Sequence, residues 1–305
     1  MDVLICTAKD QHAWRGALAA CLPEARIHTG PDAVDCDYAV VWKPSPELFA
    51  RQQRLKALFS LGAGVNALLA MPSLPRDVPL VRMEDAGMAD QMVEYALYVA
   101  LREFRRFRDY ARDESQARWA PQPLRTRGSY RIGILGLGVL GGAVAQALAG
   151  FGFDVGGWSR GAKDLPGVAC EHGDAGLDAL LRRSDLVMLF LPLTRETDTL
   201  LDRVRLALLP AGAVLANLSR GELVDDGALL EALDTGALGA AYLDVFREEP
   251  LPADHRFWSH PRVEMTPHVA ALTDVAVACE QVAGKIRRLE AGLPISGLVD
   301  RLREY

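Results

Sequence analysis

Three glycines in the middle of the chain have the spacing of a phosphate-binding turn. Gly136, Gly138 and Gly141 form the pattern G-x-G-x-x-G, between an apolar run that predicts a strand and a small-residue run that predicts a helix. The first glycine permits a tight bend, the second lets the backbone approach a pyrophosphate, and the third lets helix and strand pack closely. The N–H groups at the start of the helix, where Val139 and Leu140 lie, would face the phosphates. The pattern predicts a dinucleotide-binding unit, and a purely structural glycine turn is the alternative.

The next predicted strand ends in residues that suit a different nucleotide from the usual one. About 20 residues after the glycines, an Asp or Glu normally accepts hydrogen bonds from the adenosine ribose. Here Ser159 and Arg160 follow Trp158. A carboxylate would repel a 2′-phosphate, whereas a hydroxyl and a guanidinium would bind one, with Lys163 as a further positive charge. We therefore predict NADP(H) as the preferred cofactor and NAD(H) as the weaker one; a solvated surface arginine is the alternative.

Three further motifs carry a resemblance to a known family. They are NLSRGELVD at 217–225, LDVFREEPLP at 243–252 and TPHVA at 266–270. With VWKP at 41–44, LGAGV at 61–65, GMADQMVEYA at 87–96, WSR at 158–160 and VDR at 299–301, the chain resembles the D-isomer-specific 2-hydroxyacid dehydrogenase family over essentially its whole length. Within that family it is most similar to the glyoxylate/hydroxypyruvate reductase A branch. The resemblance implies hydride transfer to a small 2-oxo acid, with glyoxylate and hydroxypyruvate giving glycolate and D-glycerate.

The resemblance implies three catalytic residues, and their chemistry agrees with it. The planar guanidinium of Arg220 can hold the carboxylate and the carbonyl oxygen of a 2-oxo acid. His268 can give and take a proton near neutrality, and Glu249 is the acid that would orient its ring and stabilise its charged form. The neighbouring Glu248 is expected to be solvated. For His268 alone, a structural histidine is the alternative.

The cofactor pocket is expected to include residues at the ends of two later strands. Pro192 and Thr197 in LPLTRET resemble the family's cofactor-adjacent loop. Asp244 matches a family position that contacts the nicotinamide carboxamide, and capping of a strand-to-loop turn is the alternative. His268 is expected to lie against both cofactor and substrate.

The substrate carboxylate also needs N–H donors, and a second glycine-containing turn can supply them. Gly62, Ala63 and Gly64 can present backbone groups in a nest-like turn. Trp42 is predicted to wall this pocket or to be a core indole. Asn66 stands where many relatives carry Asp, and we expect it to lie outside direct substrate contact. No metal site is predicted.

The elements that must position these residues alternate along the chain, which predicts two doubly wound parallel-sheet domains of the α/β class. Predicted strands are 3–6, 38–42, 57–60 and 80–82, then 132–135, 154–158, 186–190, 213–217, 240–244 and 263–265. The family's domain order implies a flavodoxin-like substrate domain at 1–97 plus 273–305 and an NADP-binding Rossmann domain at 98–272.

A long helix at 89–112 and a polar segment at 113–129 are expected between the two blocks. Family members are commonly dimers, and the helix with this polar arm suggests a homodimer here. Trp119 in the arm is a candidate to reach a partner's active site. Five arginines between 102 and 112 are interpreted as the solvated face of the helix, with a binding patch as the alternative.

Composition excludes several other classes. A net charge of -6 in 305 residues gives no general attraction to nucleic acid or to anionic membrane. Five scattered cysteines, without C-x-x-C, favour reduced thiols in the cytoplasm. The first residues are expected to form a strand and not a signal peptide, and no apolar run is long enough to span a bilayer.

Two other functions stay open. One is a D-2-hydroxyacid dehydrogenase for another 2-oxo acid, such as a bulkier one or 3-phosphoglycerate; a formate dehydrogenase is disfavoured, since those relatives pair the histidine with Gln. The other is a non-catalytic NADP(H)-sensing protein like the corepressors built on this fold. The combination of Arg220, Glu249 and His268 argues against such a sensor.

Overall fold

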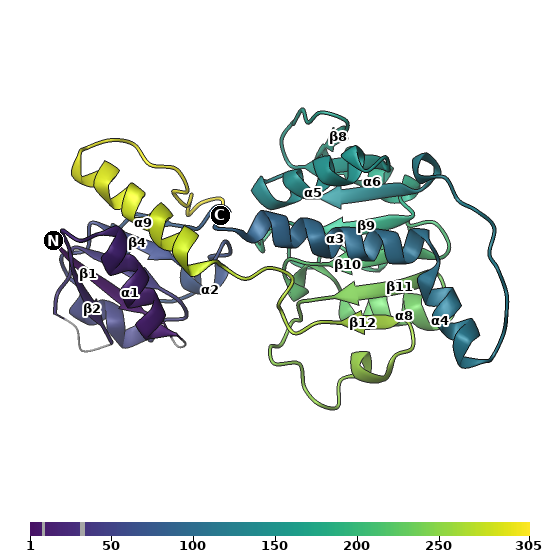
Figure 1. The fold of residues 1–305 in the computed structure, drawn as a ribbon, viewed down its shortest axis with the longest axis horizontal. Coiled ribbons are helices and arrows are strands. Elements are labelled where there is room, and N and C mark those ends of the chain that lie inside the picture. Colours follow the sequence, from purple (N-terminus) through teal and green to yellow (C-terminus); the bar gives the residue numbers. More distant parts are fainter. Residues whose placement is uncertain (8–9, 31–33) are drawn as a thin grey trace. The chain divides into compact units, whose positions relative to one another are not determined.

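The chain forms two compact units, each described here by itself. The computed structural model describes residues 1–7, 10–30 and 34–305. The first unit comprises Met1–Met88 with Leu272–Tyr305, and the second comprises Ala89–Ala271 (Figure 1). Residue 97, the predicted end of the first domain segment, lies inside helix α3 (Met88–Phe104). Among the described residues, none of the helices has the length and apolar character needed to cross a membrane.

The first unit is built on a five-stranded parallel sheet in the order β2-β1-β3-β4-β5. Its central strands are buried along their whole length, which explains why they are continuous apolar runs and not alternating ones. The helices α1 (Gln11–Cys21) and α9 (Val275–Glu290) pack against each other. The strands are β1 (Asp2–Cys6), β2 (Arg26–Thr29), β3 (Tyr38–Val41), β4 (Ala57–Ser60) and β5 (Leu80–Val81), and the short helices are η1 (Pro46–Arg51) and α2 (Asn66–Leu69).

The second unit is built on a seven-stranded parallel sheet in the order β12-β11-β10-β9-β6-β7-β8. The chain order reverses between β6 and β9, and doubly wound sheets bind ligands at the carboxyl ends of the strands beside such a point. The strands are β6 (Arg131–Leu135), β7 (Asp154–Ser159), β8 (Ala169–His172), β9 (Leu186–Leu189), β10 (Ala213–Asn217), β11 (Leu238–Leu243) and β12 (Val263–Met265).

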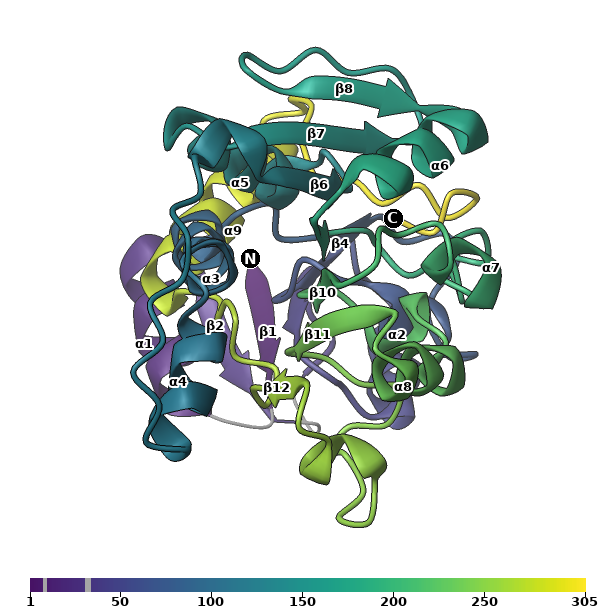
Figure 2. The ribbon, with the colours of Figure 1, turned by 90° about the vertical axis from the view of Figure 1, so that its right-hand side faces the viewer.

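Helices cover both faces of this sheet, as Figure 2 shows. On one face, α3 and α5 (Val139–Gly150) bury side chains such as Val99 and Val144 against Ile132 and Met188. The other face carries α6 (Gly173–Arg183), α7 (Arg203–Leu206) and α8 (Asp226–Thr235), with a separate apolar core. Short turns η2 (Arg127–Ser129), η3 (Gly221–Leu223) and η4 (Arg256–Ser259) and helix α4 (Phe107–Ser115) complete the unit. The two parallel sheets confirm the predicted fold class.

Two strands and one helix break differ from the sequence prediction. The strands β2 and β8 were not predicted, because they are edge strands whose side chains are only partly buried and lack an apolar run. The single long helix predicted at 89–112 is wrong: α3 ends at Phe104, and α4 starts after Arg106, whose φ of 57° is left-handed. The predicted solvated face is also broken, since Arg108 pairs with Glu103 while Arg105 lies 5.5 Å from the ring centre of Phe107.

Candidate active site

The glycine turn joins β6 to α5 at the switch point of the second sheet. Gly136 has a φ of 104°, and a Cβ there would lie 2.7 Å from the carbonyl oxygen of Phe190. A Cβ on Gly141 would lie 1.9 Å from the carbonyl oxygen of Gly136, so the close packing of helix and strand requires glycine. A Cβ on Gly138 would meet no atom within 4 Å. The two outer glycines are therefore needed by the fold, whereas the central one faces open space that suits an approaching pyrophosphate.

The N-terminus of α5 adds to this cradle. Gly138 is its N-cap, and the amide N–H groups of Val139 and Leu140 fall in the first turn, where a helix has no internal acceptors for them. The helix has 12 residues, so its dipole places partial positive charge at this end. The geometry fits a dinucleotide phosphate group.

The end of β7 carries the residues predicted to select the nucleotide. The Ser159 hydroxyl donates to the Gly161 carbonyl at 2.7 Å, which holds the turn after the strand. Arg160 pairs with Glu196 at 2.9 Å, and both side chains are largely exposed. Lys163 is exposed in the loop beyond. A 2′-phosphate would compete with Glu196 for the guanidinium of Arg160, and such an exposed pair is weak enough to exchange.

The loop after β9 brings Pro192 and Thr197 to the same edge of the sheet. The Thr197 hydroxyl donates to the Pro192 carbonyl at 2.7 Å, and the Thr194 amide donates to the Thr197 hydroxyl at 2.8 Å. These bonds close the loop on itself. Glu196, the partner of Arg160, belongs to the same loop, so the loop and the end of β7 are in contact.

Arg220 follows β10 in a loop that the backbone fixes tightly. The Asn217 side-chain amide donates to the Arg220 carbonyl at 2.7 Å, and the Ser219 amide donates to the Asn217 side-chain oxygen at 3.2 Å. A Cβ on Gly221 would lie 2.0 Å from the Phe246 carbonyl carbon, so this glycine lets the loop lie directly on the loop after β11. Burial lowers the pKa of the Arg220 guanidinium, opposed by the carboxylates of Glu222 and Glu249. The side chain is still a cation near neutrality, and its desolvation favours an anionic ligand.

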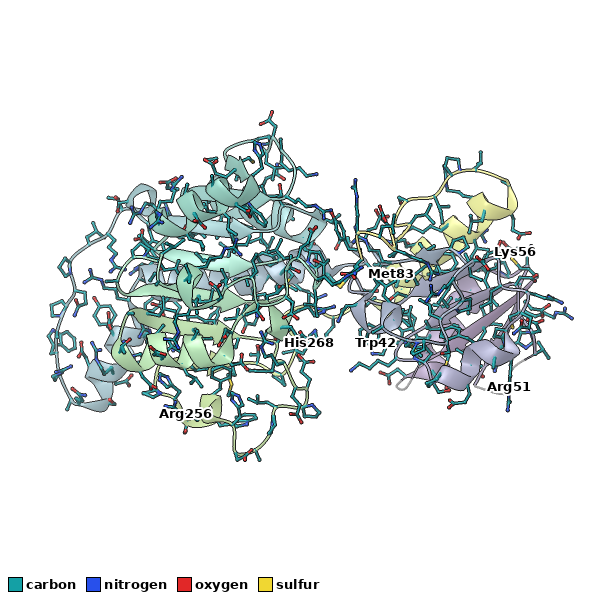
Figure 3. All side chains as sticks on the ribbon, turned by 180° about the vertical axis from the view of Figure 1, so that it is seen from behind. Trp42, Arg51, Lys56, Met83, Arg256 and His268 are labelled. Atoms are coloured by element: carbon teal, nitrogen blue, oxygen red, sulfur yellow. The ribbon has the colours of Figure 1, made fainter. Side chains whose placement is uncertain are left out.

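Glu249 and His268, the predicted proton-transfer pair, are in direct contact. His268 Nδ1 lies 2.7 Å from Glu249 Oε2, while Glu249 Oε1 accepts from the Phe246 amide at 3.1 Å. This leaves Nε2 of His268 as the nitrogen for a substrate. His268 lies on the loop after β12 (Figure 3), and its backbone has a left-handed φ of 55°. Glu248 is exposed.

Asp244 holds the histidine loop in place. Its carboxylate is 1% exposed and accepts from the Thr266 hydroxyl at 2.6 Å and from the amides of Val269 and Ala270 at 2.8 and 2.9 Å. The Asp244 carbonyl accepts from the His268 amide at 2.8 Å. These contacts cap the turn after β11, which was the alternative prediction for Asp244. A contact between Asp244 and the nicotinamide stays a prediction.

Two contributors to this arrangement gave no signal in the sequence. The Tyr95 hydroxyl of α3 lies 2.8 Å from the Thr266 hydroxyl. Since Thr266 gives its only proton to Asp244, Tyr95 is the donor in that contact. Arg247 donates to the Val224 carbonyl at 2.8 Å and to the Glu222 carbonyl at 2.9 Å, which ties the loop before Glu249 to the loop after Arg220. Each contact joins residues far apart in the chain, so no local pattern marks it.

The predicted substrate residues of the first unit lie together at the carboxyl ends of β3 and β4. A Cβ on Gly62 would lie 2.3 Å from the Trp42 ring, so the indole is in close contact with this glycine. Trp42 is 41% exposed and therefore is not a core indole (Figure 3). The Gly62 amide faces the Ser60 hydroxyl at 3.3 Å. Ala63 and Gly64 are partly exposed in the same turn, and Asn66, also partly exposed, begins α2.

Comparisons with known proteins place the chain in a family. The family profile described as D-isomer specific 2-hydroxyacid dehydrogenase, NAD binding domain, matches residues 97–270. A glyoxylate/hydroxypyruvate reductase A from Serratia proteamaculans is 46% identical over 299 residues, which cover 96% of each chain.

Solved structures agree. A D-isomer specific 2-hydroxyacid dehydrogenase from Xanthobacter autotrophicus Py2, in complex with NADPH and MES, is 41% identical with a TM-score of 0.95, covering 100% of this chain and 99% of that one. An NADPH-dependent glyoxylate/hydroxypyruvate reductase from Sinorhizobium meliloti, in complex with NADP and sulfate, is 38% identical with a TM-score of 0.94 and the same coverage.

The fold and the site define a nicotinamide-dependent oxidoreductase with a Rossmann domain. The chain belongs to the D-isomer specific 2-hydroxyacid dehydrogenase family.

Proposed function

We propose that this protein uses NADPH to reduce small 2-oxo acids to D-2-hydroxy acids, with glyoxylate and hydroxypyruvate as its main substrates and glycolate and D-glycerate as the products. The observation that carries the proposal is the 2.7 Å contact between His268 and Glu249, in the same unit as Arg220 and the glycine turn. The relatives from Serratia proteamaculans and Sinorhizobium meliloti, one similar in sequence and the other in structure, are both named as glyoxylate/hydroxypyruvate reductases.

The cofactor-binding residues follow from the site. Gly138 and the amides of Val139 and Leu140 would receive the pyrophosphate, while Ser159 and Arg160, with Lys163, would bind the 2′-phosphate. Pro192 and Thr197, in the loop between β9 and α7, would contact the bound nucleotide. When bound, NADPH supplies the hydride for the carbonyl carbon of the acid.

The remaining steps belong to side chains of this protein. Arg220 orients the substrate through its carboxylate and stabilises charge that develops on the carbonyl oxygen. His268 carries a proton on Nε2 and transfers it to that oxygen, and Glu249 stabilises the imidazolium from the Nδ1 side. Asp244, at the end of β11, positions His268 through its hydrogen bonds to the loop after β12. The backbone N–H groups of Gly62, Ala63 and Gly64, with Trp42, are the proposed contacts to the rest of the acid.

We also propose a homodimer in the cytoplasm. Trp119 and Leu124 in the polar arm are 98% and 93% exposed, and large apolar side chains exposed in this way favour burial against a partner. All five cysteines are free thiols, which suits a reducing compartment. Sedimentation at several protein concentrations tests the dimer, and Trp119→Ala should shift it toward monomer.

The test of function is a comparison of cofactors and acids. Oxidation of NADPH and of NADH is followed with glyoxylate, hydroxypyruvate, pyruvate and a branched 2-oxo acid. We expect NADPH with the first two acids to give the highest kcat/KM. Equal activity with NADH would contradict the cofactor assignment, and preference for the branched acid would indicate another dehydrogenase of this family. NADPH binding without turnover of any acid would favour the sensor.

A further inference from the structure

The second unit has a cavity at the opposite edge of its sheet from the glycine turn. It has a volume of about 890 Å³ and lies where strands begin: Tyr130 precedes β6, Asp185 precedes β9, and Ala213 opens β10. The junction of α3 with α4 forms another wall, at the end of the unit where Figure 1 shows α4 and the arm. We call this space the amino-edge cavity. The NADP-binding residues proposed above all lie at the carboxyl ends of the same strands, so this cavity is a separate site.

Five arginines and three acids line the amino-edge cavity. Each of the three carboxylates is paired with an arginine: Glu103 with Arg108 at 3.0 Å, Asp109 with Arg112 at 3.2 Å, and Asp185 with Arg131 at 2.7 Å. These pairs leave little negative charge to neutralise the remaining arginines of the cavity.

Three lining arginines have only neutral partners. Arg106 donates to the Gln122 side-chain oxygen at 2.8 Å, Arg125 to the Glu103 carbonyl at 3.4 Å, and Arg262 to the Leu238 carbonyl at 3.1 Å. Within residues 1–7, 10–30 and 34–305, these three guanidinium groups make no ion pair with a carboxylate. Arg125 still acts on Asp185 through longer-range charge attraction, but none of the three guanidinium groups has a carboxylate of the described residues in direct contact.

Arg106 adds an independent sign of a binding site. Its Nε is buried and, among the described atoms, has no hydrogen-bond partner, although buried donors are normally paired. Its backbone has a left-handed φ of 57°, which is uncommon for arginine. This conformation breaks the helix between α3 and α4 and sets the side chain in the cavity wall.

We propose that the amino-edge cavity binds a small polyanion with at least two phosphate or carboxylate groups. The guanidinium group matches both kinds of anion with two parallel hydrogen bonds. The volume is at the upper end of the range for small-molecule sites, so it accommodates a ligand with several charged groups. Arg106, Arg125 and Arg262 bind the anion, and the paired acids hold the neighbouring arginines in place.

The test measures binding of inorganic pyrophosphate and of citrate by calorimetry. The protein is saturated with NADP⁺ to occupy the nucleotide site, and sodium chloride keeps the ionic strength constant, because salt screens exposed charges. We expect one anion to bind per chain. The double variant Arg106→Gln/Arg125→Gln should weaken binding at least tenfold, and Arg182→Gln, an exposed arginine on α6 outside the cavity, should leave it unchanged.

A second measurement keeps the test valid if the double variant does not fold. Phenylglyoxal labels arginines of the wild-type protein, and peptide mass spectrometry follows each site. Bound anion should slow the labelling of Arg106, Arg125 and Arg262 at least fivefold but not that of Arg182. Tighter binding of pyrophosphate than citrate would identify a phosphate ligand, and the reverse a polycarboxylate.

Three results would overturn the proposal: neither anion binds, the double variant binds as well as the wild type, or labelling of the three arginines is unaffected. The readout is binding and not turnover, so this outcome is separate from failure of the proposed reductase function.

Discussion

Two regions at the carboxyl edge of the second sheet are built in opposite ways. The proposed catalytic region, with Asp244 and His268, is held by a buried carboxylate and by its bonds to backbone amides. The proposed 2′-phosphate region depends on Arg160, which pairs with the exposed Glu196 at the surface. Buried contacts fix the backbone that carries His268 in the first region, whereas the second region depends on an exposed pair of side chains.

This difference has a functional meaning. Proton transfer loses efficiency when the donor moves by a fraction of a bond length, so a histidine that acts as an acid needs fixed supports. Recognition of a phosphate by a guanidinium tolerates more freedom, because charge attraction acts over a longer range. Substitutions should therefore damage turnover in the first region and change cofactor preference in the second.

The largest effect is expected from His268→Gln. Loss of the proton donor should lower kcat by about 10²- to 10⁴-fold with NADPH and glyoxylate. The His268 amide still reaches the Asp244 carbonyl in the variant, so the melting temperature should stay close to that of the wild type. Steady-state kinetics and thermal unfolding measure both. A variant that keeps most of its turnover would remove His268 from the mechanism.

The adjacent glutamates give the next largest effect and a matched control. In Glu249→Gln the imidazolium loses its charged partner, which is worth about 1.5–3 kcal/mol, so kcat should fall roughly 10- to 100-fold. Glu248→Gln removes an exposed charge one residue away and should leave kcat within about twofold. Equal loss in the two variants would show that the effect is not specific to the pair with His268.

The nucleotide region should respond in preference and not in turnover. Arg160→Asp loses charged hydrogen bonds to the 2′-phosphate and adds repulsion, so the ratio of kcat/KM for NADPH over NADH should fall at least about tenfold. The control Glu196→Gln releases Arg160 from a surface pair worth about 0–1 kcal/mol, so NADPH should bind up to about fivefold more tightly. An unchanged ratio in Arg160→Asp would assign the preference to other residues.

Much of the fold could be predicted because its signals are local. The helix at 226–235 begins with Asp225, whose side chain accepts from the Ala228 amide, and ends at Gly236 in a left-handed conformation. Caps and periodicity of this kind are visible in the sequence. The edge strands β2 and β8 gave no such signal, since exposure allows polar residues along them. The break at Arg106 also escaped prediction, because a left-handed arginine has no sequence signature.

In the candidate site, too, residues with a local sequence signal could be predicted and residues that meet only in the fold could not. The glycine turn could be found from spacing, because its three glycines act within one turn. The capping partners of Asp244 could not, since Thr266, Val269 and Ala270 come next to it only when β11 and β12 pair. Contacts formed by strand pairing depend on the register, and one sequence does not reveal that register.

The smallest effect tests whether the support of the catalytic region extends beyond Asp244. Tyr95→Phe removes only the hydroxyl that donates to Thr266, a bond worth about 1 kcal/mol. If Tyr95 positions His268 through Thr266 and Asp244, kcat should fall about two- to fivefold while the KM for NADPH stays the same.

The control is Tyr98→Phe on the same helix, whose hydroxyl contacts Glu264 outside the histidine loop. It should leave kcat unchanged. Burial raises the pKa of the Tyr95 phenol, so the hydroxyl stays protonated across the neutral range and the difference between the variants should not depend on pH there. Equal kcat in both variants would show that Tyr95 does not help to position His268. A change in KM for NADPH would instead place Tyr95 in cofactor binding.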